Sequence, residues 1–338
     1  MTLRRQRTLG KERPLGIPNI EDRVVQMAAK LVLEPIFEAD LEPDSYGFRP
    51  QRSAHQALEA IRESLSDGMV WVLDADVSSY FDTIPHDKLM KVIAKRVVDS
   101  SMLALVKMFL AAPVIDERVG GGPRRAKAGV PQGGVVSPLL ANVYLHLLDR
   151  SFRRSVERGS LEGRLVRYCD DFVLLCRHQP EQKMHWLRAL MGRLELELHP
   201  DKTRLVDTRK EGFDFLGYRV SRRGRAVKLD ISLHSRRRIH ARLRQPTRLL
   251  FLGIEEVVER LNPYIRGARE YYKLAPWWSL RCLDGVTKMR LARWWGKKLK
   301  LGHPAWSRVS GQQLQTRHGV LSWAGRPSWD QRIVCACG

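Results

Sequence analysis

The sequence has few cysteines and no long apolar segment. Its 338 residues include five cysteines, an odd number, which does not suit the disulfide framework of a small secreted domain. No run of 18 apolar residues occurs, which excludes an ordinary membrane-spanning helix. Residues 1–13 are basic, but no apolar segment follows them, so they do not form a secretory signal. We therefore expect a cytoplasmic protein without membrane contact.

Several catalytic and metal-binding patterns are missing as well. The ten histidines are scattered and form no nucleophilic triad, and no GxxxxGK[ST] phosphate-binding loop occurs. Cys335 and Cys337 have the spacing of half a metal knuckle, but Cys282 and His318 do not complete a zinc pattern. Hydrolase chemistry of the triad type, a Walker-type nucleotide site and a zinc centre are therefore not expected.

Acidic residues are scarce only in the last part of the chain. Residues 1–200 hold 29 basic and 26 acidic residues, whereas residues 201–338 hold 30 basic and 11 acidic residues. Seven of the nine tryptophans also lie in this basic part, from Trp277 onward. Cations displace counterions from phosphates, and flat rings stack on unpaired bases. The pattern favours a nucleic-acid surface over a merely solvated one, because such charge destabilises a fold unless a polyanion relieves it.

Apolar periodicity predicts both helices and strands. The expected strands are short apolar runs at 69–75, 164–168 and 172–176, with a hairpin over 213–220 and 225–229 and a turn at 120–123. The expected helices lie at 20–40, 53–65 (with Ser53 as N-cap), 88–98, 139–152, 180–196 and from 235 to about 301. A domain boundary is expected near 230–235.

Acidic residues gather at the ends of the predicted strands. Asp74 lies at the end of the strand at 69–75 and Asp76 and Asp82 follow it, and Asp170 and Asp171 lie between two strands. Adjacent carboxylates at a hairpin tip repel each other, and a divalent cation relieves that cost. Two such ions about 4 Å apart stabilise the attacking and leaving oxygens of a phosphoryl transfer. A solvated turn remains the alternative interpretation of these acids.

Eight ordered blocks resemble the reverse transcriptase/maturase proteins of bacterial group II introns. They are RPLGIPNIEDRVVQ (13–26), SYGFRPQRSAHQAL (45–58), DADVSSYFDTIPH (74–86), GVPQGGVVSPLLANVYLHLLD (129–149), RYCDDFVLLC (167–176), LHPDKT (198–203), FDFLGYRV (213–220) and LNPYIRGAREYY (261–272). Telomerase and viral reverse transcriptases share the acids but not the whole set.

The resemblance implies an α+β, right-hand polymerase fold whose palm carries the acids on an antiparallel sheet. It implies partial fingers and palm over residues 1–232, an all-α basic thumb or maturase domain over 233–301, and a loop-rich tail over 302–338. By this resemblance, we expect a chain that begins at the family's second block and is short at its N-terminus. No C-terminal nuclease with paired Cys motifs is found.

The resemblance also assigns the metal and catalytic residues. Asp76, Asp170 and Asp171 match the metal-binding acids, and Val77 offers a backbone carbonyl to the second of two Mg²⁺ ions, with Mn²⁺ as an alternative. Lys202 is assigned as the proton donor to pyrophosphate, with an ordinary surface lysine as the alternative.

Four residues are assigned to the incoming nucleotide. Phe81 matches the aromatic that excludes a ribose 2′-hydroxyl, although a role in the palm core is its alternative. Gln132 and Gly133 match the segment that contacts the nucleotide, and Arg13 matches a triphosphate ligand, ahead of Arg7 and Lys11. An arginine fork suits phosphate oxygens.

Nucleic acid is assigned to the region after the palm. Phe215, Leu216 and Gly217 resemble the hairpin that holds the primer end. Further arginines, on the helices after residue 235, resemble those that bind intron RNA: Arg236, Arg237, Arg238 and Arg266.

The resulting hypothesis is an RNA-directed DNA polymerase that extends a DNA 3′-hydroxyl on intron RNA with dNTPs and also assists splicing. A bacterial location with the ribonucleoprotein or nucleoid follows, and a dimer is left open. Two alternatives remain: an RNA-binding maturase without polymerase activity, and a truncated, inactive retroelement remnant.

Overall fold

The computed structural model describes residues 2–8, 11–113, 115–116, 127–300, 313 and 317–325; for 2–8, 11–15, 17 and 115–116 it describes the backbone alone. Its contacts divide the chain into two units. Unit 1 comprises Met1–Phe213 with Arg222–Ala226, and unit 2 comprises Asp214–Ser221 with Val227–Gly338. Each unit is described separately.

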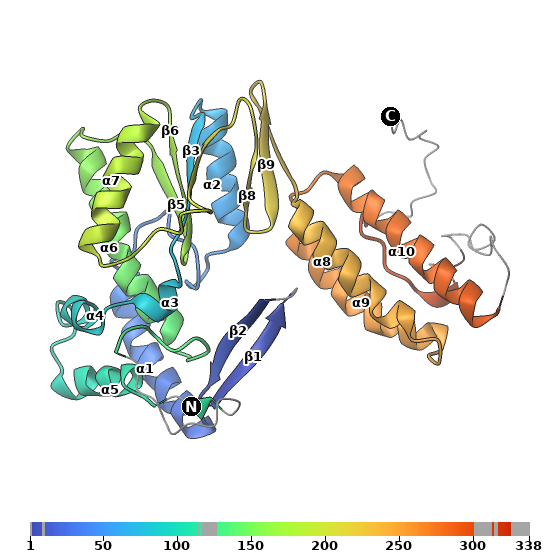
Figure 1. The fold of residues 1–338 in the computed structure, drawn as a ribbon, viewed down its shortest axis with the longest axis horizontal. Helices are drawn as coiled ribbons and strands as arrows, with labels where there is room; N and C mark the ends of the chain where they lie inside the picture. The colour runs from blue at the N-terminus through green and yellow to red at the C-terminus, as the bar shows by residue number, and fades with distance from the viewer. Residues whose placement is uncertain are drawn as a thin grey trace. The chain divides into compact units, whose positions relative to one another are not determined.

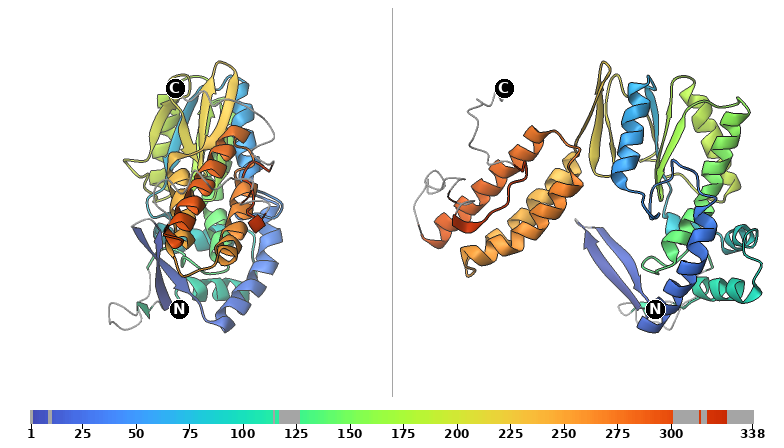
Figure 2. Two further views of the ribbon diagram at one scale, coloured as in Figure 1. Left: turned by 90° about the vertical axis from the view of Figure 1, so that its right-hand side faces the viewer. Right: turned by 180° about the vertical axis from the view of Figure 1, so that it is seen from behind.

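A four-stranded antiparallel sheet forms the centre of unit 1. Its strands, in spatial order, are β5 (Arg164–Tyr168), β6 (Asp171–Cys176), β3 (Trp71–Asp76) and β7 (Arg204–Asp207). Helix α2 (Ala54–Ser66) covers one face, and α6 (Ser137–Glu157) and α7 (Pro180–Arg193) cover the other (Figures 1 and 2). Five consecutive residues of β6 are buried, as expected for a strand that is covered on both faces.

The remaining elements of unit 1 surround this sandwich. The helices are α1 (Ile20–Glu38), α3 (Tyr80–Thr83), α4 (His86–Ile93) and α5 (Ser100–Leu110). A second sheet has the order β2-β1-β4, formed by β1 (Thr2–Thr8), β2 (Lys11–Ile17) and β4 (Ile115–Asp116). One apolar core joins β3 and β6 to α6 and α7, and α6 alone buries eleven residues. Burying the apolar face of this helix therefore contributes to the stability of unit 1.

Unit 2 begins with a small sheet and continues as helices. The sheet has the order β10-β9-β8, formed by β8 (Phe213–Phe215), β9 (Tyr218–Arg223) and β10 (Ala226–Ile231). The helices are α8 (Leu233–Arg244), a 3₁₀ turn (Pro246–Arg248), α9 (Ile254–Tyr271) and α10 (Trp277–Lys298). The buried ring of Trp323 donates to the Thr287 hydroxyl of α10 at 2.9 Å. Residues near 323 thus pack on α10, within the tail that was expected to be loop-rich.

The α+β class is confirmed, and the Ser53 N-cap is present as a capping box with Gln56. Two predicted boundaries are wrong. The helix expected over 88–98 ends at Ile93, before the N-cap Asp99 of α5. The strand expected over 213–220 is split, because Leu216 and Gly217 both have positive φ (48° and 78°) and form a turn.

Other predictions fall partly or wholly beyond the described part of the chain. The turn at 120–123 lies outside the described residues, as do Cys335 and Cys337. Within the described residues, no helix is both long enough and apolar enough to cross a membrane.

Candidate active site

Two predicted metal ligands face each other across neighbouring strands. Asp76 is the last residue of β3 and Asp171 is the first of β6, and the antiparallel register pairs them directly. Side chains of such a pair project from the same face of the sheet, about 5 Å apart at their Cβ atoms. Asp170 lies in the two-residue turn between β5 and β6, next to Cys169. The fold therefore brings Asp76 near Asp170 and Asp171, which lie almost 100 residues further along the chain.

The negative charges act on one another. The pKa of Asp171 is raised to about 6, first because its carboxyl is partly removed from water and then because Asp170, Asp76 and Asp74 are nearby. The ammonium of Lys202 opposes this shift and forms an ion pair with Asp76. Asp74 is paired with Arg204 at 3.3 Å. The ionised acids thus carry an electrostatic cost, which Lys202 partly offsets.

This cost gives a pH-dependent stability that a metal changes. The folded protein binds a proton at Asp171 more tightly than the unfolded chain does, so this contribution to stability is greatest below pH 4 and is lost as pH rises through about 6. We expect Asp171→Asn, in EDTA at pH 8, to melt a few degrees above the wild type. The advantage should shrink from pH 6 to pH 4, as calorimetry can measure.

Added Mg²⁺ should raise the melting temperature of the wild type more than that of Asp171→Asn. The cation binds to the carboxylates of the folded protein and offsets their repulsion, and the variant has one carboxylate fewer. Asp87→Asn is the matched control, since this carboxylate lies on the surface of α4 with 67% of its side chain exposed. An Asp171→Asn protein that melts below the wild type at pH 8 would contradict the electrostatic account.

The acids border a cavity of about 670 Å³. The predicted residues that line it are Asp76, Val77, Phe81, Gln132, Gly133, Asp170, Asp171 and Lys202. The Gln132 amide donates to Asp82 at 3.3 Å. The pKa of Asp82 is raised, because partial burial removes water from its carboxyl and the hydrogen bond to Gln132 offsets this effect only in part. A cavity of this size lies within the range of small-molecule binding sites.

A glycine holds the Gln132 segment against the turn that follows the acidic strand. Gly129 has φ +91°, and a Cβ there would lie 2.7 Å from the Phe81 carbonyl oxygen. The next residue, Val130, donates its N–H to that same carbonyl at 2.6 Å. The Gln132 carbonyl accepts from the Gly16 N–H at 2.6 Å, so β2 lies beside the cavity's Gln132 side. Arg13, Arg7 and Lys11 lie on β2 and β1, but their side chains lie outside the described residues.

The chain after β3 is also held in place beside the acids. The backbone of His199 donates to the Asp76 carbonyl at 2.8 Å, and Val77 forms an antiparallel bridge with Leu198. These contacts place the following residues, including Lys202, close to Asp76. The ammonium of Lys202 is half exposed, so its proton is accessible to a ligand in the cavity.

The predicted nucleic-acid residues belong to unit 2 and differ in exposure. Phe215 is buried, with 4% of its surface exposed, so its side chain does not present itself to a ligand. Arg236 donates to Asp230 and to the hydroxyl of Ser279, and so stabilises the start of α8. Arg237, Arg238 and Arg266 are exposed.

Sequence reasoning assigned no role to two further residues of the cavity. Phe48 lines it with a side chain that is 55% exposed and a left-handed backbone (φ 54°), which is unusual for a bulky residue. His199 also lines it, and its buried Nδ1 has no hydrogen-bond partner among the described atoms. Phe48 lies within block 45–58 and His199 within block 198–203, so the resemblance of these blocks to the family could have indicated both residues.

The donor atoms suit magnesium in type, because carboxylate and carbonyl oxygens are its preferred ligands. The like charges that raise the pKa of Asp171 also favour a bound cation. Among the described residues, however, no three His, Cys, Asp or Glu side chains converge closely enough to hold an ion. Lys202 instead neutralises Asp76. The residues therefore fit a divalent cation in kind, but the described side chains do not form a complete set of ligands for one.

An antiparallel sheet with acids at two strand ends, facing an aromatic side chain and an amide, has the features of a polymerase palm. Residues 4–220 match the family described as "Reverse transcriptase (RNA-dependent DNA polymerase)", and residues 236–310 match "Group II intron, maturase-specific domain". The chain therefore belongs to the group II intron reverse transcriptase/maturase family, as its sequence blocks predicted.

Two bacterial proteins are among its relatives. Protein YkfC of Escherichia coli (strain K12) is 37% identical over 63% of this chain and 64% of its own length. Group II intron-encoded protein LtrA of Lactococcus lactis subsp. cremoris is 31% identical over 63% of this chain and 45% of its own length. The match thus spans less than two thirds of either relative.

Solved telomerase structures share the fold. The telomerase of Candida albicans, in complex with a TWJ fragment of telomeric RNA, superposes with a TM-score of 0.56 at 14% identity. This covers 93% of this chain and 62% of the telomerase chain. Apo telomerase of Candida tropicalis gives a TM-score of 0.54 and covers 92% and 63%. The reverse transcriptase fold that was predicted is confirmed.

Proposed function

We propose that this chain is an RNA-directed DNA polymerase of group II intron type, which extends a DNA 3′-hydroxyl along an RNA template with dNTPs. The observation that carries the proposal is the direct pairing of Asp76 with Asp171, beside Asp170, at the edge of a nucleotide-sized cavity. Phosphoryl transfer needs little covalent chemistry from the protein, so positioning and charge neutralisation account for most of the rate.

Each residue at the cavity has a proposed task. Asp76, Asp170, Asp171 and the carbonyl of Val77 hold two divalent cations, Mg²⁺ or Mn²⁺, which when bound stabilise the attacking and leaving oxygens. Lys202 donates a proton to the leaving pyrophosphate. The nucleotide is held by Gln132 and Gly133 with the triphosphate on Arg13, while Phe81 lies at the sugar.

Primer extension by the full 338-residue chain tests this function. The assay uses a labelled DNA primer annealed to RNA, with all four dNTPs and Mg²⁺, and an EDTA control. Extension that requires the cation supports the proposal. A folded chain that binds RNA and extends nothing contradicts it, and leaves the second candidate.

That second candidate is an RNA-binding maturase, whose role in splicing also coexists with polymerisation. The match of residues 236–310 to the maturase-specific domain favours it, and that domain implies binding of intron RNA. Exposed cations on α8 and α9, and the exposed rings of Trp277 and Trp278 on α10, supply charge and stacking surfaces.

The exposed arginines give a salt-dependent test. We expect Arg237→Ala/Arg238→Ala/Arg266→Ala to weaken binding of intron RNA about equally across sequences, because phosphate contacts carry no sequence information. The slope of log K against log salt should fall in magnitude by about two to three, since each lost phosphate contact contributes about one. Filter binding from 50 to 300 mM KCl measures both quantities.

The matched control removes three exposed arginines of unit 1, namely Arg154, Arg158 and Arg188. It changes the net charge by the same amount, so it should leave the slope nearly unchanged. Equal slopes for both triple variants would show that the arginines act through overall charge and not through a binding surface.

A further inference from the structure

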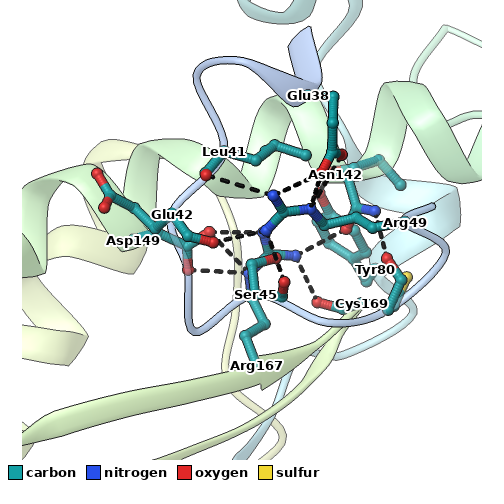
Figure 3. A network of polar contacts seen from close by, with 12 residues as sticks. Glu38, Leu41, Glu42, Ser45, Arg49, Tyr80, Asn142, Asp149, Arg167 and Cys169 are labelled. Atoms are coloured by element: carbon teal, nitrogen blue, oxygen red, sulfur yellow. Dashed lines mark hydrogen bonds and ion pairs between the residues drawn. The ribbon is translucent and has the colours of Figure 1, made fainter. Parts of the chain in front are cut away.

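A fully buried guanidinium contacts the backbone of Cys169, the residue before Asp170 (Figure 3). Arg167 is the fourth residue of β5 and has no exposed surface. Its Nε and Nη2 donate to the Asp149 carboxylate of α6, at 2.9 and 2.5 Å. Its Nη1 donates to the side-chain oxygen of Asn142 at 2.9 Å and to the Cys169 carbonyl at 3.0 Å. One side chain thereby connects α6 to the turn that carries Asp170.

Segment 44–48 also packs against the turn that carries Asp170. The Asn142 amide donates to the Gly47 carbonyl at 2.6 Å. Gly47 lies so near the turn that a Cβ there would be 2.4 Å from the Cys169 nitrogen. The Arg167 N–H also donates to the Asp44 carbonyl at 3.0 Å. Segment 44–48 therefore packs against the back of the acidic turn, and only glycine fits at its closest point.

Another buried arginine holds that segment. Arg49 donates to the Glu38 carboxylate at 2.7 and 3.0 Å, and to the carbonyls of Glu42 and Ser45 at 2.6 Å each. The guanidinium thus satisfies the loop's own backbone oxygens and ties them to the end of α1 (Figure 3). Arg49 therefore stabilises the conformation of segment 44–48, which packs against Cys169.

Stability alone does not account for burying Arg167 with Asp149. Two charges lose their hydration in such a pair, and apolar residues of similar volume often stabilise a fold as well or better. The distinctive contact is the one to the turn. Cys169 has φ 60°, a left-handed conformation that costs a non-glycine residue free energy. Arg167 donates to the carbonyl of this left-handed residue, directly before Asp170.

We propose that Arg167 is a positioning residue, which fixes the Cys169–Asp170 turn so that the three acids meet in one geometry. A guanidinium is suited to this task because its planar fork reaches three acceptors at once. The inference rests on the proposed polymerase function for its kinetic consequence, but its structural consequence is independent of that function.

The test removes the fork without leaving a buried charge unpaired. Arg167→Met/Asp149→Leu eliminates both ions, so its melting temperature should stay near that of the wild type. We expect kcat for primer extension to fall about 100-fold, the order expected when reacting groups move by about 1 Å. The Kd for the primer–template duplex should change less than twofold, because the turn does not carry the duplex.

A second readout needs no activity. In metal-free protein, amide hydrogen exchange over the hairpin 164–176 should accelerate at least tenfold in the double variant, relative to the wild type. If the wild type proves inactive as a polymerase, this measurement still decides whether Arg167 holds the turn. Faster exchange supports the proposal, whereas unchanged exchange overturns it.

Arg167→Lys keeps the charge opposite Asp149 but cannot reach three acceptors. This variant tests whether Arg167 positions the turn if the double variant does not fold. It too should lose kcat and exchange faster. Arg177→Met is the matched control beside the same hairpin, because the Arg177 guanidinium donates to the Asp67 carbonyl and contacts neither the turn nor segment 44–48. Wild-type kcat and exchange in Arg167→Lys would show that the network only supports the fold.

Discussion

Replacing both acids of the turn should abolish DNA synthesis while leaving the protein folded. In Asp170→Asn/Asp171→Asn, two of the three carboxylates that are proposed to bind metal become neutral amides of nearly the same size. We expect the rate of primer extension to fall by at least about 10³-fold, because phosphoryl transfer depends strongly on stabilising the charge of its transition state. Single-turnover primer extension on RNA, at saturating dNTP and Mg²⁺, measures the loss.

Misfolding is not the expected reason for that loss. The ionised acids repel each other and raise the pKa of Asp171 to about 6, so neutral amides should stabilise the metal-free protein. A melting temperature at or above that of the wild type would accompany the lost rate. Asp87→Asn, on the surface of α4, should retain full activity. Extension by the double variant within tenfold of the wild type would exclude these acids from catalysis.

The same variant separates polymerisation from splicing. The maturase-specific match lies at 236–310, whereas both substituted residues lie at the tip of the β5–β6 hairpin. We therefore expect intron splicing to continue in Asp170→Asn/Asp171→Asn. Loss of splicing along with synthesis would indicate that the intron RNA also needs the acidic turn.

Shortening Phe81 should admit ribonucleotides. The ring lines the cavity and packs edge-on against Tyr80, with centroids 5.7 Å apart. Tyr80 is fully buried, and its hydroxyl donates to the Ala141 carbonyl at 2.6 Å, so the Phe81 ring has a firm support. In Phe81→Ala, we expect the preference for dNTP over rNTP to fall roughly 10- to 200-fold, the range for filling or emptying an apolar space of this kind.

The ratio of kcat/KM for dCTP and CTP, measured on one RNA template, reports this discrimination. Phe81→Tyr keeps the ring and should keep the preference. If Phe81 serves only the core of the palm, Phe81→Ala should melt at a lower temperature and discriminate as the wild type does. An unchanged ratio in a folded Phe81→Ala protein would remove Phe81 from the sugar site.

Local patterns were sufficient for the elements that carry the site. The alternation from apolar runs to acids located β3, β5 and β6, and the Ser53 capping box marked the start of α2. These features depend on neighbouring residues in the chain, so they can be recognised without a structure. Motif resemblance then supplied the family, which the matches at 4–220 and 236–310 confirm.

Boundaries and partners depended on contacts that no local pattern records. The apolar run at 213–220 predicted one strand, but the left-handed Leu216 and Gly217 divide it. The family resemblance assigned Arg236 to intron RNA, and in the structure its guanidinium donates to Asp230 and Ser279. Charge in a sequence does not indicate whether a neighbour in space has already neutralised it.

By itself, the sequence determined the types of residue at the site and their order along the chain: paired acids after apolar strands, a glycine-flanked Gln132, and a basic, tryptophan-rich last part. Only the tertiary structure decided the register that sets Asp76 opposite Asp171, the ion pair of Lys202 with Asp76, and the support of the Cys169 turn by Arg167 and Gly47. The physical reason is range. Strand and helix propensities act over a few residues, whereas register, burial and charge pairing depend on segments about 100 residues apart that meet only when the core closes.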